Sequence, residues 1–286
     1  MAKLSVVLAT RNEEENIGRC LESVRRLADE IIVVDENSTD KTREIAEDFG
    51  AKVYLEPHHD IFHTTKQKAL DYAAGDWILQ LDADEMVTPE LAKEIVEVVK
   101  GTPRRWSKLP ELFARHQRLI EQRDGSIGKK TGEVVAFFIP RRNIFLGKPL
   151  IHAGVYPDGV IRLVKRGKAY FPEKSVHEQM VVEGKTSWLL NDLFHYDSPT
   201  LKRYFSRMNR YTDLHAQELK EKKISKSVWA FLLYTIYKPL YTFCSLYFRH
   251  FGFLDGVPGF LWCFFSALHF PIAYFKYLTD NRENES

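Results

Sequence analysis

The first hundred residues alternate between short apolar runs and segments in which apolar residues recur every three or four positions. The runs predict buried strands, because a strand covered on both faces needs no polar alternation, and they lie at residues 4–9, 30–35, 51–55 and 77–81. The amphipathic segments between them predict helices, and Pro89 is placed to open a further helix. Strand–helix alternation with short connections predicts an α/β fold with a mostly parallel sheet flanked by helices.

This alternation of strands and helices ends at a strongly basic stretch, residues 101–132, in which a few apolar positions indicate one helix. We interpret the stretch as an insertion. Beyond it, residues 134–139 predict a strand, residues 160–164 and 169–171 predict a hairpin, and residues 200–222 predict a helix.

Three carboxylates, Asp82, Asp84 and Glu85, follow the apolar run at residues 77–81. In open parallel sheets, ligands bind at the carboxyl ends of the strands. Proteins hold Mg2+ with carboxylate oxygens together with substrate phosphates. The acids therefore indicate a metal site that holds a diphosphate, although a lone Asp-x-Asp motif is more often a loop of solvated acids.

Polar residues also follow the first two predicted strands. Thr10, Arg11 and Glu13 come after the first, and Asp35 ends the second. If a nucleotide binds at this edge, Asp35 would accept hydrogen bonds from its base or ribose, and Thr10 and Glu13 would line the base pocket. The competing interpretation is that these residues only cap the helices that follow.

Composition restricts the classes of partner and compartment. The 41 basic and 39 acidic residues give a net charge of +2, so overall charge does not indicate a nucleic-acid partner, and none is expected. The 3 cysteines lie far apart, which argues against a disulfide framework or a zinc site and fits a reducing compartment. The first residues predict a strand rather than a basic and apolar leader, so no signal peptide is expected.

Three blocks in this order resemble the family 2 glycosyltransferases of the GT-A fold. They are LSVVLATRNEE at residues 4–14, IVVD followed by STD within residues 32–40, and LDADE at residues 81–85. The resemblance implies a nucleotide-sugar donor, a divalent metal (Mg2+ or Mn2+) and inversion at the anomeric carbon. The first block departs from the family pattern, because Ala9 and Arg11 replace its usual Pro-x-Tyr, and this leaves open which side chain stacks on the base.

The resemblance also implies roles for individual residues. Asp84, the second acid of the motif, would be the direct metal ligand, and Asp82 would contact the ribose or a metal-bound water, so both are metal candidates. Lys66 matches a basic position near the diphosphate, although a solvated helix face explains it as well. The donor-binding candidates are Thr10, Arg11, Glu13, Asp35, Lys66, Asp82 and His177.

Further blocks resemble the lipopolysaccharide core β-glucosyltransferase branch of that family. They are PRRNIFLGK at residues 140–148, IRLVKR at residues 161–166 and VHE at residues 176–178. An inverting transfer needs a general base for the acceptor proton, and Glu178 matches the family's position for it, so Glu178 is the catalytic candidate. The alternative is a surface acid after a strand. His177 would orient Glu178, bind the donor or merely pack.

His195 has two possible roles. The resemblance implies that a late histidine of this kind completes the metal shell in some GT-A enzymes. The sequence favours the competing interpretation, a histidine that only precedes a helix.

The predicted helix at residues 200–222 carries Arg203, Arg207 and Arg210 on one face, because they are four and three positions apart. Arginine is well suited to phosphate recognition. We expect this face to contact acceptor phosphates or anionic lipid headgroups.

The tail at residues 229–277 holds nearly half of the chain's Trp, Tyr and Phe residues. Prolines interrupt its apolar stretches, whereas about 20 continuous apolar residues are needed to span a bilayer. Aromatic richness beside a basic flank predicts helices that lie in the membrane interface. We expect peripheral, monotopic attachment at the cytoplasmic face of the inner membrane, with a spanning hairpin or a soluble packed tail as alternatives.

These features predict a nucleotide-sugar-binding α/β half at residues 1–100, the basic insertion, an acceptor-side half at residues 133–222 and a membrane-associating helical tail at residues 223–286. The expected function is transfer of a sugar from a UDP-glucose-like donor to a lipid-linked saccharide such as lipopolysaccharide inner core. One alternative is transfer to a polyprenyl phosphate, which needs less help from a base. Another is a non-catalytic, membrane-bound module that binds nucleotide sugars.

Overall fold

The computed structural model of the chain describes residues 2–59, 61–101, 109–172 and 180–280. The chain divides into two compact units, Met1–Arg142 with Pro157–His195 and Asn143–Tyr156 with Tyr196–Ser286. The boundary predicted between residues 222 and 223 therefore lies inside the second unit, and the basic segment 101–132 belongs to the first.

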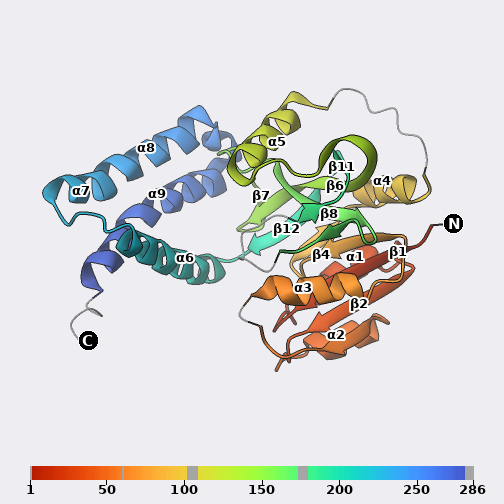
Figure 1. Cartoon of the computed structure of the whole chain (residues 1–286). Coiled ribbons are helices and arrows are strands. Elements are labelled where there is room, and N and C mark those ends of the chain that lie inside the picture. The colour runs from red at the N-terminus through yellow and green to blue at the C-terminus, as the bar shows by residue number, and fades with distance from the viewer. Residues whose placement is uncertain (1, 60, 102–108, 173–179, 281–286) are drawn as a thin grey trace. The chain divides into compact units, whose positions relative to one another are not determined.

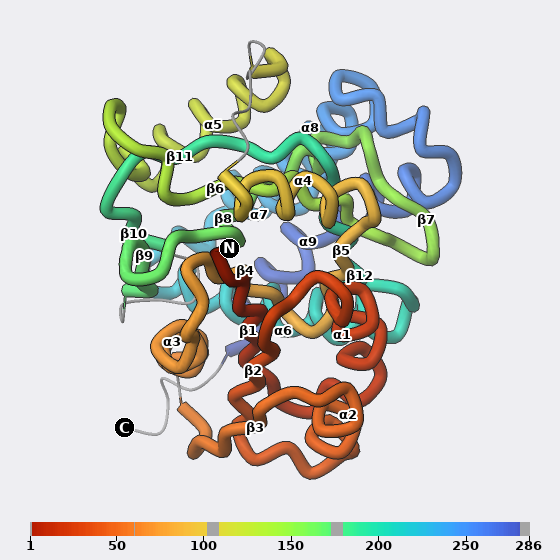
Figure 2. The backbone as a smooth tube through the Cα atoms, turned by 90° about the vertical axis from the view of Figure 1, so that its right-hand side faces the viewer, coloured from red at the N-terminus to blue at the C-terminus, as the bar shows by residue number. Residues whose placement is uncertain are grey.

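Four parallel strands form the amino-terminal part of the first unit (Figure 1). They lie in the order β3-β2-β1-β4 and comprise β1 (Leu4–Thr10), β2 (Glu30–Asp35), β3 (Lys52–Leu55) and β4 (Trp77–Leu81). The helices that join them are α1 (Ile17–Val24), α2 (Thr42–Asp48) and α3 (Phe62–Asp71). Figure 2 shows α3 on one side of these strands and α1 and α2 on the other, which is the predicted α/β arrangement.

Local sequence explains these elements. Every residue of β1 is buried, as its continuous apolar run predicts, and the apolar stripe of α1 packs into the same core. α1 begins only at Ile17, because the chain first makes a turn in which Asn12 has a φ of 54° and the Asn16 N–H bonds to the Glu13 carbonyl oxygen at 3.0 Å. Thr10 and Glu13 therefore do not cap this helix.

The sheet continues beyond β4 in the order β8-β6-β12-β5, so it is mixed. β8 (Asp158–Lys165) runs antiparallel to β4 on one side and to β6 (Lys129–Phe145) on the other. β5 (Glu85–Val87) pairs with the start of β12 (Leu193–Ser198). The α/β class predicted from the sequence is confirmed, with helices flanking a sheet that is parallel in its first half.

The hairpin predicted for residues 160–164 and 169–171 is wrong. Both edges of β8 are already occupied by β4 and β6, and β9 (Ala169–Tyr170) pairs instead with β10 (Val181–Val182) in a small separate sheet. The other elements of this unit are α4 (Pro89–Val99), α5 (Glu111–Asp124) and β11 (Lys185–Trp188). α4 begins at Pro89 as predicted, and the Thr88 hydroxyl accepts the Leu91 N–H there.

The second unit is mostly helical (Figure 1). α6 (Leu201–Glu221) packs against α9 (Gly256–Thr279), and the tyrosine rings of Tyr234 and Tyr274 stack in its interior with centroids 5.1 Å apart. Between α6 and α9 the chain forms α7 (Val228–Leu232), a π-helical turn (Leu233–Tyr237), α8 (Lys238–Cys244), a second π-helical turn (Ser245–Arg249) and a 3-10 turn (Gly252–Asp255). The short strand β7 (Lys148–Pro149) also belongs to this unit.

The prolines that interrupt the apolar stretches of the tail lie within its helices. Pro239 lies in the first turn of α8, where its missing N–H costs least, directly after a wider π-helical turn. Pro271 lies inside α9, which still runs for 24 residues. Among the described residues, the stretch Gly252–Thr279 is long and apolar enough to cross a membrane by length and composition, and an 18-residue window within it has a mean hydropathy of 1.4.

Candidate active site

Asp82 follows the last residue of β4 and is enclosed by two cations from the first unit. Its Oδ2 accepts a hydrogen bond from Arg162 Nη2 at 2.5 Å, and its Oδ1 lies 2.5 Å from Lys66 Nζ. Burial alone would raise the pKa of Asp82, but the charges of Arg162 and Lys66 outweigh it and hold this pKa well below its ordinary value. Asp82 is therefore a carboxylate at neutral pH.

Arg162 comes from the middle of β8 and is almost completely buried. Besides Asp82 it donates to the Gln80 side-chain oxygen and to Glu85 Oε1 at 2.7 Å. The other Glu85 carboxylate oxygen accepts the Asp82 N–H at 3.0 Å, and Glu85 itself is fully buried. Arg162 therefore fixes both ends of the turn that carries the Asp-Ala-Asp motif.

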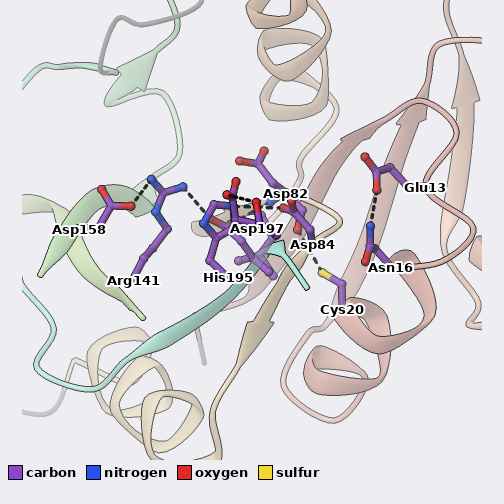
Figure 3. Close-up of polar contacts among 12 residues, drawn as sticks. Glu13, Asn16, Cys20, Asp82, Asp84, Arg141, Asp158, His195 and Asp197 are labelled. Atoms are coloured by element: carbon purple, nitrogen blue, oxygen red, sulfur yellow. Dashed lines mark hydrogen bonds and ion pairs between the residues drawn. The ribbon is translucent and has the colours of Figure 1, made fainter. Parts of the chain in front are cut away.

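A second arginine supports the same turn from β6. Arg141 Nη1 lies 3.5 Å from Glu85 Oε1, and Arg141 Nη2 donates to Asp158 Oδ2 at 2.6 Å (Figure 3). Glu85, which the sequence grouped with Asp82 and Asp84 as an acid of a possible metal site, is thus the buried anion between two arginines.

Asp84 is the acid of the motif that points to a histidine. Figure 3 shows Asp84 and His195 side by side, and His195 Nε2 lies 3.6 Å from Asp84 Oδ1. The pairing of β12 with β5 places His195 directly opposite Glu85. Within the described ranges, no group of three or more His, Cys, Asp or Glu side chains is arranged to hold a metal ion. A carboxylate and an imidazole suit a divalent cation that takes its remaining ligands from phosphate oxygens.

Lys66 lies on α3, next to the motif rather than on a solvated helix face. Its side chain is only 12% exposed, and its ammonium lies 5.5 Å from the centroid of the Phe62 ring in addition to its ion pair with Asp82. The role of Lys66 at the diphosphate stays a prediction, and its ion pair with Asp82 is compatible with that role.

The ends of β1 and β2 are more enclosed than expected for a base pocket. Thr10 and Asp35 are completely buried, and the Asp35 carboxylate accepts hydrogen bonds from the Thr10 hydroxyl at 3.1 Å and from the Ser38 N–H at 2.7 Å. Glu13 accepts a hydrogen bond from the Asn16 side chain at 2.8 Å. The donor-binding roles of Thr10, Glu13 and Asp35 stay predictions, and the contacts of Asp35 are those of a residue that holds the loop after β2.

Two predicted residues lie outside the described residues, namely His177 and Glu178. The three arginines predicted to bind phosphate lie on α6 in the second unit, as the sequence indicated. Arg207 is ion-paired with Asp197, and Arg210 lines a cavity of about 1050 Å³ with Lys220, Lys223 and Lys276. The phosphate-binding role of Arg203, Arg207 and Arg210 stays a prediction.

Sequence reasoning missed Arg162 and Arg141 as site residues. For Arg162 the available signal was a charged residue at the centre of an otherwise apolar strand, since buried arginines are rare unless paired. It also expected His195 only before a helix, whereas His195 lies on β12, because the antiparallel return of β12 beside β5 is not visible in the local sequence.

Comparison with known proteins indicates the family to which part of the chain belongs. Residues 5–108 match the sequence model of Glycosyl transferase family 2. The chain is 28% identical over 291 residues to an uncharacterized glycosyltransferase of Rickettsia conorii, covering 99% of this chain and 90% of that protein. It is also 28% identical over 278 residues to the lipopolysaccharide core biosynthesis glycosyltransferase LpsC of Rhizobium meliloti, covering 92% and 90% of the two chains.

Among solved structures, one similar chain is mannosyltransferase PcManGT from Pyrobaculum calidifontis, with a TM-score of 0.47, 16% identity and coverage of 98% of this chain and 88% of that chain. The order of the three sequence blocks, the mixed sheet and the similar proteins all indicate the same family. Residues 5–108 form a family 2 glycosyltransferase domain, and the protein is a glycosyltransferase.

Proposed function

We propose that the protein is an inverting, metal-dependent enzyme that transfers a sugar from a nucleotide-sugar donor, UDP-glucose or a close analogue, to a lipid-linked saccharide such as lipopolysaccharide inner core. The observation that carries the proposal is the grouping of Asp82, Asp84, Lys66 and His195 at the carboxyl end of β4. The 28% identity to LpsC supports the acceptor class.

In this proposal Asp84 and His195 hold the metal, and Asp82 does not. Both Asp82 oxygens are already paired, one with Lys66 and one with Arg162, so a metal would compete with two cations. Asp82 instead keeps Lys66 beside the position of the diphosphate. A divalent ion held by Asp84 and His195 would neutralise the charge that develops on the departing diphosphate.

The chain's own residues then have separate tasks. Lys66 contributes a second positive charge to the diphosphate, and Arg162 keeps the motif in place. During transfer the acceptor oxygen bonds to the anomeric carbon as the carbon–oxygen bond to the diphosphate breaks. Glu178, from the sequence resemblance, takes the proton of the acceptor hydroxyl.

The membrane part of the proposal rests on the exposed aromatic and aliphatic residues of the second unit. Trp229 is 81% exposed and Val257 is 71% exposed, and many neighbouring apolar side chains are at least 40% exposed. Exposed apolar surface of this extent marks an interaction site, and aromatic residues favour the membrane interface. We place the enzyme peripherally on the cytoplasmic face, where a lipid-linked acceptor is within reach.

The test is nucleotide release by the purified full-length chain in detergent, with a panel of nucleotide sugars, Mn2+ or Mg2+, and lipopolysaccharide of truncated core as acceptor. We expect release from one donor that requires both metal and acceptor, and loss of release in Asp84→Asn. Turnover with a polyprenyl phosphate but not with the saccharide, unaffected by Glu178→Gln, would replace the acceptor in this proposal. Absence of turnover with every donor and acceptor would refute it.

A further inference from the structure

Two adjoining hollows in the second unit are lined by the carboxyl-terminal parts of α6 and α9 and by the residues that follow them. The larger has a volume of about 1050 Å³ and the smaller about 310 Å³, and they share Lys220, Lys223 and Asp280. We call them together the basic cavity, because its described lining has an excess of two positive charges. The basic residues are Arg210, Lys220, Lys223, Lys226 and Lys276, and the acidic ones are Asp213, Glu221 and Asp280.

Two of these cations are paired within the protein. Lys276 Nζ donates to the Asp213 carboxylate at 2.7 Å and to the Asn209 side-chain oxygen at 2.7 Å, which ties α9 to α6. Lys220 Nζ lies 3.7 Å from Asp280 Oδ2. These contacts hold the walls of the basic cavity together and account for two of its three acids.

The other three cations have no such partner. Within the described part of the chain, neither Arg210 nor Lys223 makes an ion pair or a side-chain hydrogen bond, and Lys226 contacts the face of the Tyr277 ring, 5.3 Å from its centroid. Glu221, the remaining acid, already accepts a hydrogen bond from a glutamine one turn earlier on α6. Arginine and lysine side chains gathered in this way suit an anion, and phosphate oxygens above all.

Lys223 occupies a backbone position that normally favours glycine. Its φ is 49°, and the N–H groups of Lys223 and Ile224 bond to the carbonyl oxygens of Lys220 and Leu219 at 2.9 and 3.1 Å. These bonds form the Schellman motif that ends α6, in which the left-handed residue is usually glycine. A lysine there is less favourable for the backbone, and it adds a cation that lines both hollows.

The dipole of α6 does not account for the whole basic cavity. Cations near the carboxyl end of a helix complement its dipole, which explains Lys220 and Lys223. Arg210 lies well before the last turn of α6, and Lys226 follows the helix. These two residues contribute charge to the cavity where the helix dipole has little effect.

The chain that leaves the basic cavity leads directly to exposed apolar side chains. Two residues after Lys226, α7 begins with Val228, which is 72% exposed, and Trp229, which is 81% exposed. In a bilayer, headgroup phosphates lie at the level of the interfacial aromatic residues. A lipid with its phosphate in the basic cavity would therefore have its acyl chains beside α7.

We propose that the basic cavity binds the phosphodiester of an anionic glycerophospholipid such as phosphatidylglycerol, with Arg210, Lys223 and Lys226 as its ligands. The inference rests on the membrane placement in the proposed function and names the lipid class and the site. The cavity favours an anionic lipid over phosphatidylcholine, because the choline ammonium would bring a further positive charge next to the lysines.

The experiment is calorimetric titration of the full-length chain in uncharged detergent with short-chain phosphatidylglycerol, short-chain phosphatidylcholine and inorganic phosphate. The variants are Lys223→Gly and Lys226→Gln. Lys223→Gly removes the charge and supplies the residue that the left-handed backbone favours, so the end of α6 stays intact. The matched control is Lys222→Gln, because Lys222 is the adjacent exposed cation, pairs with Glu218 at 3.3 Å and does not line the basic cavity.

We expect saturable binding of phosphatidylglycerol, and much weaker binding of phosphatidylcholine and of inorganic phosphate. Lys223→Gly and Lys226→Gln should each weaken phosphatidylglycerol binding about fivefold, the usual contribution of one basic residue at an anionic lipid surface, and Lys222→Gln should have little effect. The thermal unfolding midpoint of Lys223→Gly should equal or exceed that of the unmodified chain, so that the lost affinity reports the lost charge. Nucleotide release with a detergent-solubilised acceptor should stay near normal in both variants.

Three results would overturn the assignment. Equal losses in Lys222→Gln and Lys223→Gly would show diffuse attraction to a basic surface, and equal affinity for the two lipids would show that the charge of the headgroup is not recognised. Inorganic phosphate that bound as tightly as the lipid would make the ligand a free phosphate. A chain that transfers sugar without binding phosphatidylglycerol refutes this inference alone, whereas a chain that binds the lipid but turns over no donor refutes the proposed reaction alone.

Discussion

Arg162 donates to Asp82 across 2.5 Å, from a strand that runs antiparallel to the strand carrying the acid. The two residues are 80 positions apart in sequence. Their contact makes the first acid of the motif half of a partly buried ion pair, and for this reason we propose Asp84 rather than Asp82 as the metal ligand. The pair also contacts Glu85, so a change at Arg162 leaves two carboxylates without their main counterion.

Replacement of Arg162 by alanine should therefore destabilise the first unit strongly. Removal of one partner of a buried ion pair costs about 3–5 kcal/mol, because the remaining charge stays buried. Urea denaturation followed by tryptophan fluorescence measures this as a lower transition midpoint. Arg166→Ala, at an exposed position just beyond the end of β8, is the control and should leave the midpoint unchanged. Equal midpoints for the two variants would show that the Arg162 contacts contribute little.

The two acids of the motif should differ in their effects on metal dependence. Asp84→Asn should weaken Mn2+ binding and reduce turnover on the order of a hundredfold, as removal of an electrostatic stabiliser of the leaving group does. Asp82→Asn should reduce turnover by misplacing Lys66 while the Mn2+ concentration for half-maximal rate stays near that of the unmodified enzyme. Titration of activity with Mn2+ after chelator treatment distinguishes the effects of the two variants. If the Mn2+ concentration for half-maximal rate rose more in Asp82→Asn than in Asp84→Asn, our assignment of the metal ligand would be reversed.

Glu30 gives the fold a specific dependence on pH. Burial alone would raise its pKa, but hydrogen bonds from the Ser5 hydroxyl and the Ala74 N–H, together with Lys52, lower it below the ordinary 4.5. A lowered pKa in the folded state means that the stabilisation is present above pH 4.5 and is lost as pH falls through the lowered value.

The measurement is the free energy of unfolding of Glu30→Gln and of the unmodified protein between pH 7 and pH 3. The variant should be less stable at pH 7, and the difference should shrink as the solution becomes more acidic. Glu22→Gln is the control, because Glu22 is exposed and its only described partner is Arg25 at 4.0 Å. A difference that stays constant across the pH range would show that the ionised form of Glu30 is not the stabilising one.

The sequence was informative wherever structure depends on neighbours along the chain. The buried run of β1 and the apolar stripe of α1 follow directly from local patterns, as does the start of α4 at Pro89. The hairpin at residues 160–171 was predicted wrongly because strand pairing is decided by distant segments. β8 pairs with β4, which lies about eighty residues earlier, and β9 pairs with a strand that follows residue 180.

The candidate site shows the same limit. Asp82, Asp84 and Lys66 were identified from the motif and its resemblance, and the structure brings Lys66 and Asp82 together. Arg162 could not be placed, because only the register of Leu79 against Leu163 puts its side chain beside the motif.

The exposed apolar side chains of α7 and α9 lead to the prediction about the membrane. Trp229→Glu and Val257→Glu place a charge at positions that are 81% and 71% exposed, so neither change disturbs the interior of the second unit. If these side chains enter a bilayer interface, each variant should bind less to vesicles that contain anionic phospholipid, because a buried glutamate is costly there. Vesicle flotation of the purified full-length chain measures the bound fraction.

The control is Leu119→Glu, at an apolar residue on α5 of the first unit that is 54% exposed. It makes the same chemical change on a helix to which we assign no membrane contact, so its bound fraction should equal that of the unmodified protein. Extraction of native membranes with alkaline carbonate then distinguishes the two modes of attachment, since a peripheral chain is released and a spanning one is retained. Retention would show that the 24 residues of α9 cross the bilayer. Equal flotation of all three variants and the unmodified chain would assign the exposed apolar face to a protein partner instead.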